Sequence, residues 1–313
     1  MAEGLTLIDP RKLERNPDNP RLIFHQDELD ALQESIAAQG ILVPLTIYKD
    51  GNKHFILDGE RRWRCSLKLG LSKVPVIIQP KPDHLQNIMM MFAIHNARRD
   101  WDPLPTAIKL EELEGIFTKQ QGRKPTEKEL AELASMRRGE VRRLRKLLAL
   151  PKKYRKMLLA ELEKPRSQQR LTVDHVLEAT KAAEALRKKS IINVEKEDDL
   201  RSAIIEKFKN DTIKNTVAPR QLIKVARAVE RGDVSKAIAN KITNRLISEP
   251  KFTIDDAFEI SAQQADFQHN TEQIAERTYK AVTEHIDNGY RPSDELRRIL
   301  EKLSKAINRL LKS

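Results

Sequence analysis

An abrupt change in hydrophobic pattern near residue 84 divides the chain into two parts with different folding possibilities. Before it, short apolar and β-branched runs at 42–48, 53–57 and 74–78 alternate with short helical segments. After it, apolar residues recur at intervals of three and four, and strand-like runs cease. Alternation of apolar and polar residues indicates strands, whereas apolar residues at every third or fourth position indicate helices. The sequence therefore predicts an α+β protein, with a small α/β domain followed by helices alone.

Turn and cap residues define the elements of the N-terminal part. Asp50-Gly51 lies between the first two strand-like runs and predicts a hairpin. A helix is predicted over 27–39, because Gly40 suits its C-terminal cap. A second helix follows Gly59 and ends at Gly70.

Helices account for the rest of the chain. One is predicted over 83–99, and Pro103 and Pro105 are expected to break the chain before the next helix, at 107–121. Thr126 and Glu129 then form a capping box that starts another helix. We expect three regions, at 1–100, 101–190 and 191–313.

Residues 129–150 have the pattern of a helix-turn-helix. An apolar helix is followed by a short turn at Ser135-Met136 and by a second helix whose core positions are Val141, Leu144 and Leu147. The first ten residues of that second segment, 137–146, carry six positive charges and one negative. A recognition helix needs an apolar face to hold it and a basic face to reach phosphates and base edges. The residues expected to contact DNA are Arg137, Arg138, Glu140, Arg142, Arg143, Arg145 and Lys146.

The overall composition supports a nucleic-acid partner. The net charge of +12 favours a polyanion, and an aromatic content of 4% favours duplex over single-stranded DNA, whose bases stack on aromatic rings. Neither an apolar run long enough to cross a membrane nor a secretory leader is visible, so we expect a cytoplasmic protein without membrane contact. Cys65 is the single cysteine, which excludes an intramolecular disulfide, and it is expected to be a core residue.

The segment Asp58-Gly59-Glu60-Arg61-Arg62-Trp63-Arg64 lies where a predicted strand meets a predicted helix. The first turn of a helix offers unpaired backbone N–H groups and a partial positive charge, which suit a phosphate. Arginines at this end oppose the helix dipole unless an anion lies between them. The pattern therefore indicates an anion site, although a solvated basic face would show the same residues.

A second cluster lies at the end of the helix predicted over 83–99. Asn96 and Arg99 are three residues apart and share one helix face. An amide oxygen beside a guanidinium can hold a hydrated Mg²⁺ together with a phosphate. The spacing alone would fit an exposed helix end equally well.

From residue 8 to residue 151 the chain resembles the ParB/RepB partition family. The matching residues, in family order, are Asn16-Pro17, Asn19-Pro20-Arg21, Leu32, Ser35-Ile36, Gly40, Pro44, Gly59-Glu60-Arg61-Arg62-Trp63-Arg64, Asn96, Arg99 and Leu147-Leu148-Ala149-Leu150-Pro151. The resemblance implies a ParB/sulfiredoxin-like N-terminal domain that binds CTP with Mg²⁺. It further implies a helix-turn-helix that binds a palindromic centromere-like site as a homodimer, which closes into a sliding clamp. The resemblance also implies that the protein associates with a plasmid or the nucleoid and that it has a ParA-type ATPase as a partner.

The resemblance also assigns individual residues. Those that would contact the nucleotide are Gly59, Glu60, Arg61, Arg62, Arg64, Asn96 and Arg99, with Asn96 serving the metal. The chain departs from the family at His95, where Glu is usual, at Val43, where Gln is common, and between Asn96 and Pro103, which is one residue short. We assign no catalytic residue and expect nucleotide hydrolysis to be weak or absent.

Two other functions fit the same residues. A helix-turn-helix transcriptional regulator could keep this fold without a nucleotide cycle, which His95 and Val43 favour and Arg61-Arg62-Trp63-Arg64 opposes. A ParB-type nuclease or phosphotransferase would need an acidic metal cluster, and the sequence shows none.

The C-terminal helix carries an apolar heptad pattern. Its members are Leu296, Leu300, Leu303, Ile307 and Leu310. Because a palindromic DNA site requires a two-fold dimer, residues 293–312 are the expected dimerisation helix, although two heptads would also fit a packing helix.

Overall fold

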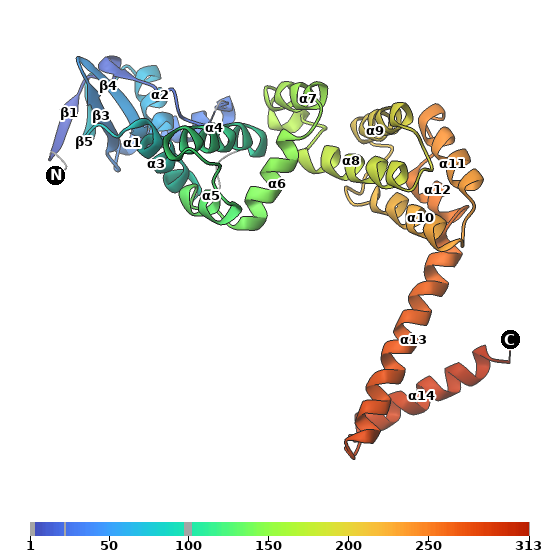
Figure 1. Cartoon of the computed structure of the whole chain (residues 1–313). Coiled ribbons are helices and arrows are strands. Elements are labelled where there is room, and N and C mark those ends of the chain that lie inside the picture. Colours follow the sequence, from blue (N-terminus) through green and yellow to red (C-terminus); the bar gives the residue numbers. More distant parts are fainter. Residues whose placement is uncertain (1–3, 22, 97–101, 313) are drawn as a thin grey trace. The chain divides into compact units, whose positions relative to one another are not determined.

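The computed structural model describes residues 4–21, 23–96 and 102–312, and the chain divides into two compact units (Figure 1). The first unit contains residues 1–181 and 201–217, and the second contains 182–200 and 218–313. Two helices, α8 (Val173–Lys188) and α9 (Val194–Lys209), therefore contribute to both units.

A five-stranded mixed sheet forms the N-terminal part of the first unit. Its strands are β1 (Leu5–Ile8), β2 (Leu13–Glu14), β3 (Leu45–Asp50), β4 (Lys53–Asp58) and β5 (Val74–Gln79), in the spatial order β1-β5-β3-β4-β2. The predicted hairpin is confirmed: β3 and β4 pair antiparallel around Gly51, whose φ is +59°. β3 begins at Leu45, three residues later than predicted, because Pro44 has no N–H to give to a ladder. β1 and β2 were not predicted, since short edge strands form only through pairing with distant partners.

Helices cover both faces of this sheet. Ile47 and Ile56 belong to the buried cluster that also contacts Trp63 of α2 (Glu60–Lys68). Their neighbours Tyr48 and Leu57 point to the opposite face and pack against Met91 of α3 (His84–Asn96).

The first helix, α1 (Gln26–Gln39), packs against α2 around Cys65, which is fully buried. Burial raises the pKa of the Cys65 thiol, which donates a hydrogen bond to the carbonyl of Leu29 (3.5 Å). The predicted core role of Cys65 is thus confirmed, and so is the predicted α+β class.

The prediction that Pro103 and Pro105 interrupt the chain before a helix at 107 was wrong. Helix α4 begins at Pro103 and runs to Gln121. A first-turn N–H has no intrahelical acceptor, so proline costs little there and its fixed φ favours the helix. The first turn is closed instead by Thr106, whose N–H and hydroxyl both donate to the Asp102 carbonyl (3.2 and 2.7 Å).

The helix-turn-helix is present as predicted. Helix α5 (Glu127–Leu133) starts at the Thr126–Glu129 capping box, and α6 (Arg138–Leu148) follows a turn in which Ser135 has a φ of +52°. Helix α7 (Lys152–Leu162) completes this region together with parts of α8 and α9.

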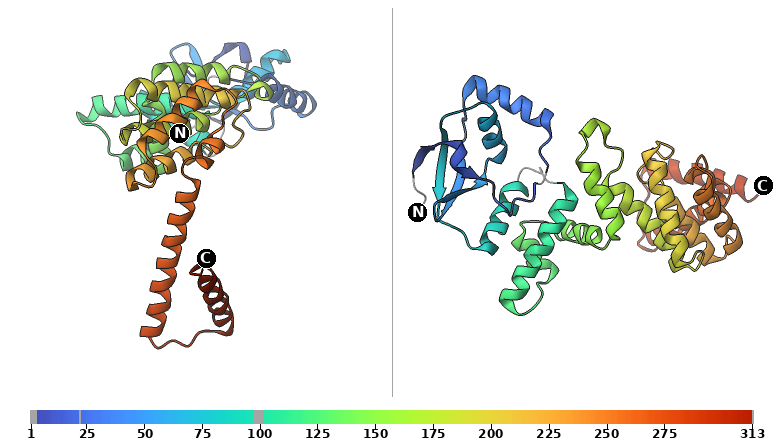
Figure 2. Two further views of the ribbon diagram at one scale, coloured as in Figure 1. Left: turned by 90° about the vertical axis from the view of Figure 1, so that its right-hand side faces the viewer. Right: turned by 90° about the horizontal axis from the view of Figure 1, so that it is seen from above.

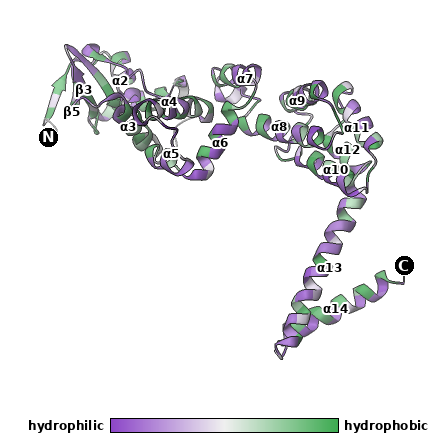
Figure 3. Cartoon of the chain, viewed as in Figure 1, coloured by the Kyte–Doolittle hydropathy of each residue, from purple (hydrophilic) through white to green (hydrophobic). Residues whose placement is uncertain are grey.

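The second unit is helical throughout its described residues. Its remaining helices are α10 (Arg220–Arg231), α11 (Lys236–Ser248), α12 (Ile254–Glu259), α13 (Gln263–Asp287) and α14 (Asp294–Leu310). α13 extends away from the α10–α12 cluster, and neither α13 nor α14 has a buried residue (Figure 2). Colouring by hydropathy shows apolar and polar residues interspersed along both helices (Figure 3). Among the described residues, no helix is both long and apolar enough to cross a membrane.

Candidate nucleotide pocket and nucleic-acid interface

The junction between β4 and α2 depends on Gly59. Its φ is +99°, and a Cβ at this position would lie 3.0 Å from Leu45 Cγ and 3.1 Å from Arg62 Cζ. Glycine is therefore the one residue that fits without strain. No side chain caps the start of α2 at Gly59, so the first backbone N–H groups of this helix face the space beside the junction.

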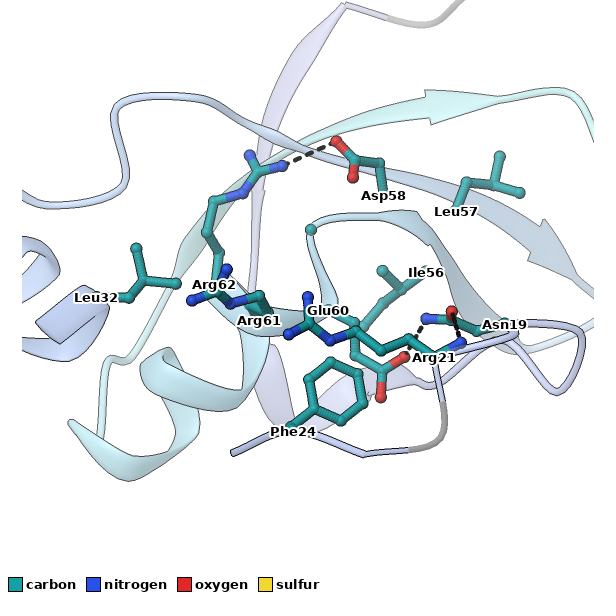
Figure 4. A pocket seen from close by; sticks show the side chains of 11 residues that line it. Asn19, Arg21, Phe24, Leu32, Ile56, Leu57, Asp58, Glu60, Arg61 and Arg62 are labelled. Atoms are coloured by element: carbon teal, nitrogen blue, oxygen red, sulfur yellow. Dashed lines mark hydrogen bonds and ion pairs between the residues drawn. The ribbon is translucent and has the colours of Figure 1, made fainter. Parts of the chain in front are cut away.

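A pocket of about 170 Å³ lies beside this junction (Figure 4). Its lining residues are Asn19, Arg21, Phe24, Leu32, Ile56, Leu57, Asp58, Gly59, Glu60, Arg61 and Arg62. Three arginines and two carboxylates thus meet over an apolar floor. Four of the five residues predicted here line the pocket: Gly59, Glu60, Arg61 and Arg62. The fifth, Arg64, forms an ion pair with Glu60 (2.7 Å).

Arg62 is held by the protein. Its Nη2 forms an ion pair with Asp58 Oδ2 (2.9 Å), and its Nη1 donates to the carbonyl of Pro44 (2.8 Å) and to that of Val43. The guanidinium therefore ties the start of β3 to the start of α2. This arrangement fixes the wall of the pocket on that side.

Glu60 and Arg64 form a second internal pair. Glu60 is buried, and its Oε1 accepts hydrogen bonds from Arg64 Nε (3.0 Å) and Nη2 (2.7 Å). Its Oε2 accepts a hydrogen bond from Asn19 Nδ2 (2.7 Å). Arg64 also lies over the ring of Phe24, with Cζ 4.0 Å from the ring centroid. In this arrangement Glu60 positions Asn19 and Arg64.

Among the arginines that line the pocket, Arg61 has a buried donor without an acceptor in the described part of the chain. Its Nη2 donates to the carbonyl of Glu28 (2.9 Å), whereas its buried Nε has no hydrogen-bond partner among the described residues. A buried donor without an acceptor costs about 1–3 kcal/mol. An acceptor oxygen of a ligand in the pocket would remove that cost.

Three arginines surround Glu28. Arg21 Nη2 lies 2.6 Å from Glu28 Oε2, Arg166 Nε lies 3.1 Å from Oε1, and Arg61 Nη2 lies 3.9 Å from Oε2. Burial acts to raise the pKa of Glu28, but the hydrogen bond from Arg166 and the three positive charges lower it below its usual value. One carboxylate among three guanidiniums leaves a positive local field that attracts anions.

Arg21, Phe24 and Glu28 were not predicted as site residues. Arg21 was visible only as part of the family pattern, and no local signal marks Phe24 or Glu28. The predicted residues Asn96 and Arg99, and also His95, lie outside the residues whose side chains the structure describes.

A buried polar network lies next to this region. Asn87 Nδ2 donates to Asn16 Oδ1 (3.1 Å) and to Asp18 Oδ2 (2.7 Å). The ligand atoms of Asp18, His84 and Glu112 approach within 4.8 Å of one another, a grouping that the sequence did not suggest. Lys109 Nζ lies 2.7 Å from Glu112 and 3.4 Å from Asp18, so one ammonium group already pairs with both carboxylates and offsets half of their charge.

The basic residues of α6 differ in their protein partners. Arg138, Arg142 and Lys146 are spaced by four and lie exposed on one face, where Arg142 Nε is 3.2 Å from Glu127 Oε1. Arg143 Nη2 is 2.9 Å from Asp174 Oδ1, and Arg145 Nη2 is 3.2 Å from Glu114 Oε2.

The two residues at the start of α6 form its cap. Glu140 Oε2 accepts a hydrogen bond from the backbone N–H of Arg137 (2.9 Å), the residue that precedes the helix. The exposed stripe Arg138, Arg142 and Lys146 lies opposite the buried residues Val141 and Leu144 of the same helix.

Comparison with known proteins covers part of the chain. ParB of Caulobacter crescentus has been solved with CTP-γ-S (22% identity, 71% of this chain and 99% of that chain covered, TM-score 0.29) and with the centromeric parS site (20%, 77% and 99%, TM-score 0.37). The model of the ParB N-terminal domain matches residues 1–96.

Curated relatives extend the match. The chromosome-partitioning protein ParB of Myxococcus xanthus is 33% identical over 148 residues, 47% of this chain and 48% of the relative. A probable chromosome-partitioning protein ParB of Xylella fastidiosa is 33% identical over 187 residues, 59% of this chain and 58% of the relative. The chain spans about half the length of the curated relatives it matches. The chain therefore carries a ParB N-terminal domain and is similar to chromosome-partitioning proteins of the ParB type.

Proposed function

We propose that the protein binds a specific duplex DNA site through α6 and that a nucleotide, CTP by the family resemblance, controls this binding in DNA partition. The observation that carries the nucleotide part is the pocket at Gly59, where the buried Nε of Arg61 has no partner among the described residues. The exposed stripe of Arg138, Arg142 and Lys146 carries the DNA part.

The pocket residues fit a phosphate-bearing ligand. The first N–H groups of α2 and the guanidiniums of Arg21 and Arg61 would hold the anion, and a nucleotide so bound would supply negative charge between groups that now repel one another. Asn96 would hold the Mg²⁺ that the resemblance implies, and Arg99 would join the triphosphate site. The pocket of about 170 Å³ is smaller than a site for a whole nucleotide, typically some 300 Å³ or more, so the surrounding chain would open on binding.

The partners follow from the same proposal. A palindromic site requires a homodimer, and the heptad residues of α14 are available for one, with Leu303 37% and Ile307 45% exposed. A ParA-type ATPase remains the partner that the resemblance implies.

A second candidate function has an observation in its favour. Arg62 and Arg64 are both held by protein carboxylates, Asp58 and Glu60, which would stabilise the pocket without a ligand. A DNA-binding regulator that has lost the nucleotide cycle would show such pairs.

Calorimetric titration of the full chain with CTP, ATP and GTP, with and without Mg²⁺, separates the two functions. We expect CTP to bind, and Arg61→Ala to weaken it by 10-fold or more, because a charge-assisted hydrogen bond contributes about 1.5–3 kcal/mol. Arg11→Ala is the matched control, since Arg11 is an exposed arginine of the same domain that pairs with Asp9 outside the pocket. If none of the three nucleotides binds, the result would favour a DNA-binding regulator without a nucleotide cycle.

A further inference from the structure

The turn between α10 and α11 repeats the turn between α5 and α6. In the first turn, Ser135 N–H donates to the Glu132 carbonyl (3.1 Å) and Met136 N–H to the Ala131 carbonyl (2.8 Å). In the second, Gly232 N–H donates to Val229 (3.2 Å) and Asp233 N–H to Ala228 (2.9 Å). Ser135 and Gly232 both have a positive φ, at +52° and +90°. The first helix of each pair therefore ends in the same way, and both linkers, 134–137 and 232–235, are four residues long.

The second helix of each pair is also seated in the same way. α6 follows Arg137 and α11 follows Ser235, both in extended conformation with ψ near 146° and 147°. Counted from the helix start, the fourth and seventh residues are buried in both: Val141 and Leu144 in α6, Ala239 and Ile242 in α11. The opposite face is therefore the outward one in each helix.

Equivalent outward positions carry related side chains. Position 1 is Arg138 in α6 and Lys236 in α11. Position 6 is Arg143 in α6, where it is exposed but pairs with Asp174, and Lys241 in α11. Position 2 is a small residue in both helices, glycine in α6 and alanine in α11, which lets the backbone approach a ligand closely. Both lysines of α11 are exposed.

Asparagines occupy positions 5 and 9 of α11, and the Nδ2 of the half-buried Asn240 donates to the Ile191 carbonyl (2.9 Å). Asn244 Nδ2 donates to Asn240 Oδ1 (2.9 Å), while Lys196 Nζ donates to Asn244 Oδ1 (3.0 Å). Asparagine is the side chain that pairs with the adenine edge in the major groove. The outward face of α11 thus combines phosphate-binding and base-reading residue types.

The charge around α11 suits an anionic partner. α11 contains three basic residues and no acidic one, whereas an ordinary solvated helix carries both signs. The two acidic residues of the α10–α11 segment, Glu230 and Asp233, are each paired, with Lys189 and with Arg231 (2.7 Å) respectively. The positive charge of Lys236 and Lys241 is therefore not offset by them.

We propose that α10 and α11 form a second helix-turn-helix, in which the outward face of α11 binds duplex DNA. This goes beyond the proposed function, for which α6 alone would suffice. It would give each chain two DNA contacts, one in each unit.

The test measures how the affinity of the full chain for duplex DNA depends on salt concentration. Binding is monitored by the fluorescence anisotropy of a labelled duplex of random sequence. The slope of log K against log salt is negative, and each lost phosphate contact reduces its magnitude by about 0.9. The double variant Lys236→Gln/Lys241→Gln should therefore reduce the magnitude by about 1.8. The matched control is Lys302→Gln/Lys305→Gln, which removes the same charge from two exposed lysines of α14 and should leave the slope unchanged. Circular dichroism and sedimentation check that fold and mass are kept.

The double variant Arg138→Ala/Arg142→Ala separately removes the expected DNA contacts of the first helix-turn-helix. We expect that variant to retain weaker binding, which disappears when the two α11 substitutions are added. A slope for Lys236→Gln/Lys241→Gln equal to that of the α14 control overturns the proposal. Unchanged binding by Arg138→Ala/Arg142→Ala would instead contradict the DNA role of α6 and leave that of α11 standing.

Discussion

Replacing Gly59 by alanine should destabilise the N-terminal domain more than any comparable change at a surface turn. A φ of +99° costs a non-glycine residue about 1–2 kcal/mol. The added Cβ would also meet Leu45 Cγ at 3.0 Å, and Leu45 is fully buried, so forcing it aside costs about 1–3 kcal/mol more. We expect a total loss of about 2–5 kcal/mol in the free energy of unfolding.

Two other glycines provide the controls. Gly70 also has a positive φ, +67°, but no described atom lies within 4 Å of its Cβ position, so Gly70→Ala should cost only about 1–2 kcal/mol. Gly139 lies in α6 with open space around it, so Gly139→Ala should stabilise that helix by about 0.5–1 kcal/mol. The series separates the conformational cost from the steric one.

Urea unfolding followed by tryptophan fluorescence measures these effects. The chain has two tryptophans, so a Trp101→Phe background leaves Trp63, whose indole N–H donates to the Pro10 carbonyl (2.8 Å), as the reporter of this domain. Equal unfolding midpoints for Gly59→Ala and Gly70→Ala would refute the close contact with Leu45. Gly59→Ala should also weaken nucleotide binding, because Gly59 lines the pocket.

Arg138→Ala and Arg142→Ala should each weaken specific duplex binding by about 1–3 kcal/mol if these residues read bases, as measured by electrophoretic or fluorescence titration; unchanged affinity would show that α6 is not the recognition helix. Leu303→Asp and Ile307→Asp place charges in the heptad seam and should shift the protein toward monomer in sedimentation while helix content is kept; an unchanged mass would exclude the seam. His95→Glu should raise nucleotide turnover in a phosphate-release assay, because a carboxylate is a permanent proton acceptor and neutral histidine accepts through one nitrogen. Family-like turnover by the unmodified protein that His95→Ala abolishes would make His95 catalytic instead.

Local signals in the sequence determined the elements and their order. The Thr126–Glu129 capping box and the turn at Gly51 formed as predicted, and Ser135-Met136 forms the turn of the helix-turn-helix. These features depend on hydrogen bonds and φ preferences within three or four residues, which the chain carries wherever it folds. The α+β class followed from periodicity for the same reason.

Tertiary structure alone decided which partner each charged side chain takes. Nothing local distinguishes Arg143, which pairs with Asp174, from Arg142, which pairs with Glu127. The contacts of Glu28 with Arg21, Arg61 and Arg166 join residues that are up to 138 positions apart. Long, flexible side chains choose partners by distance and burial, and both are set only when distant elements pack together.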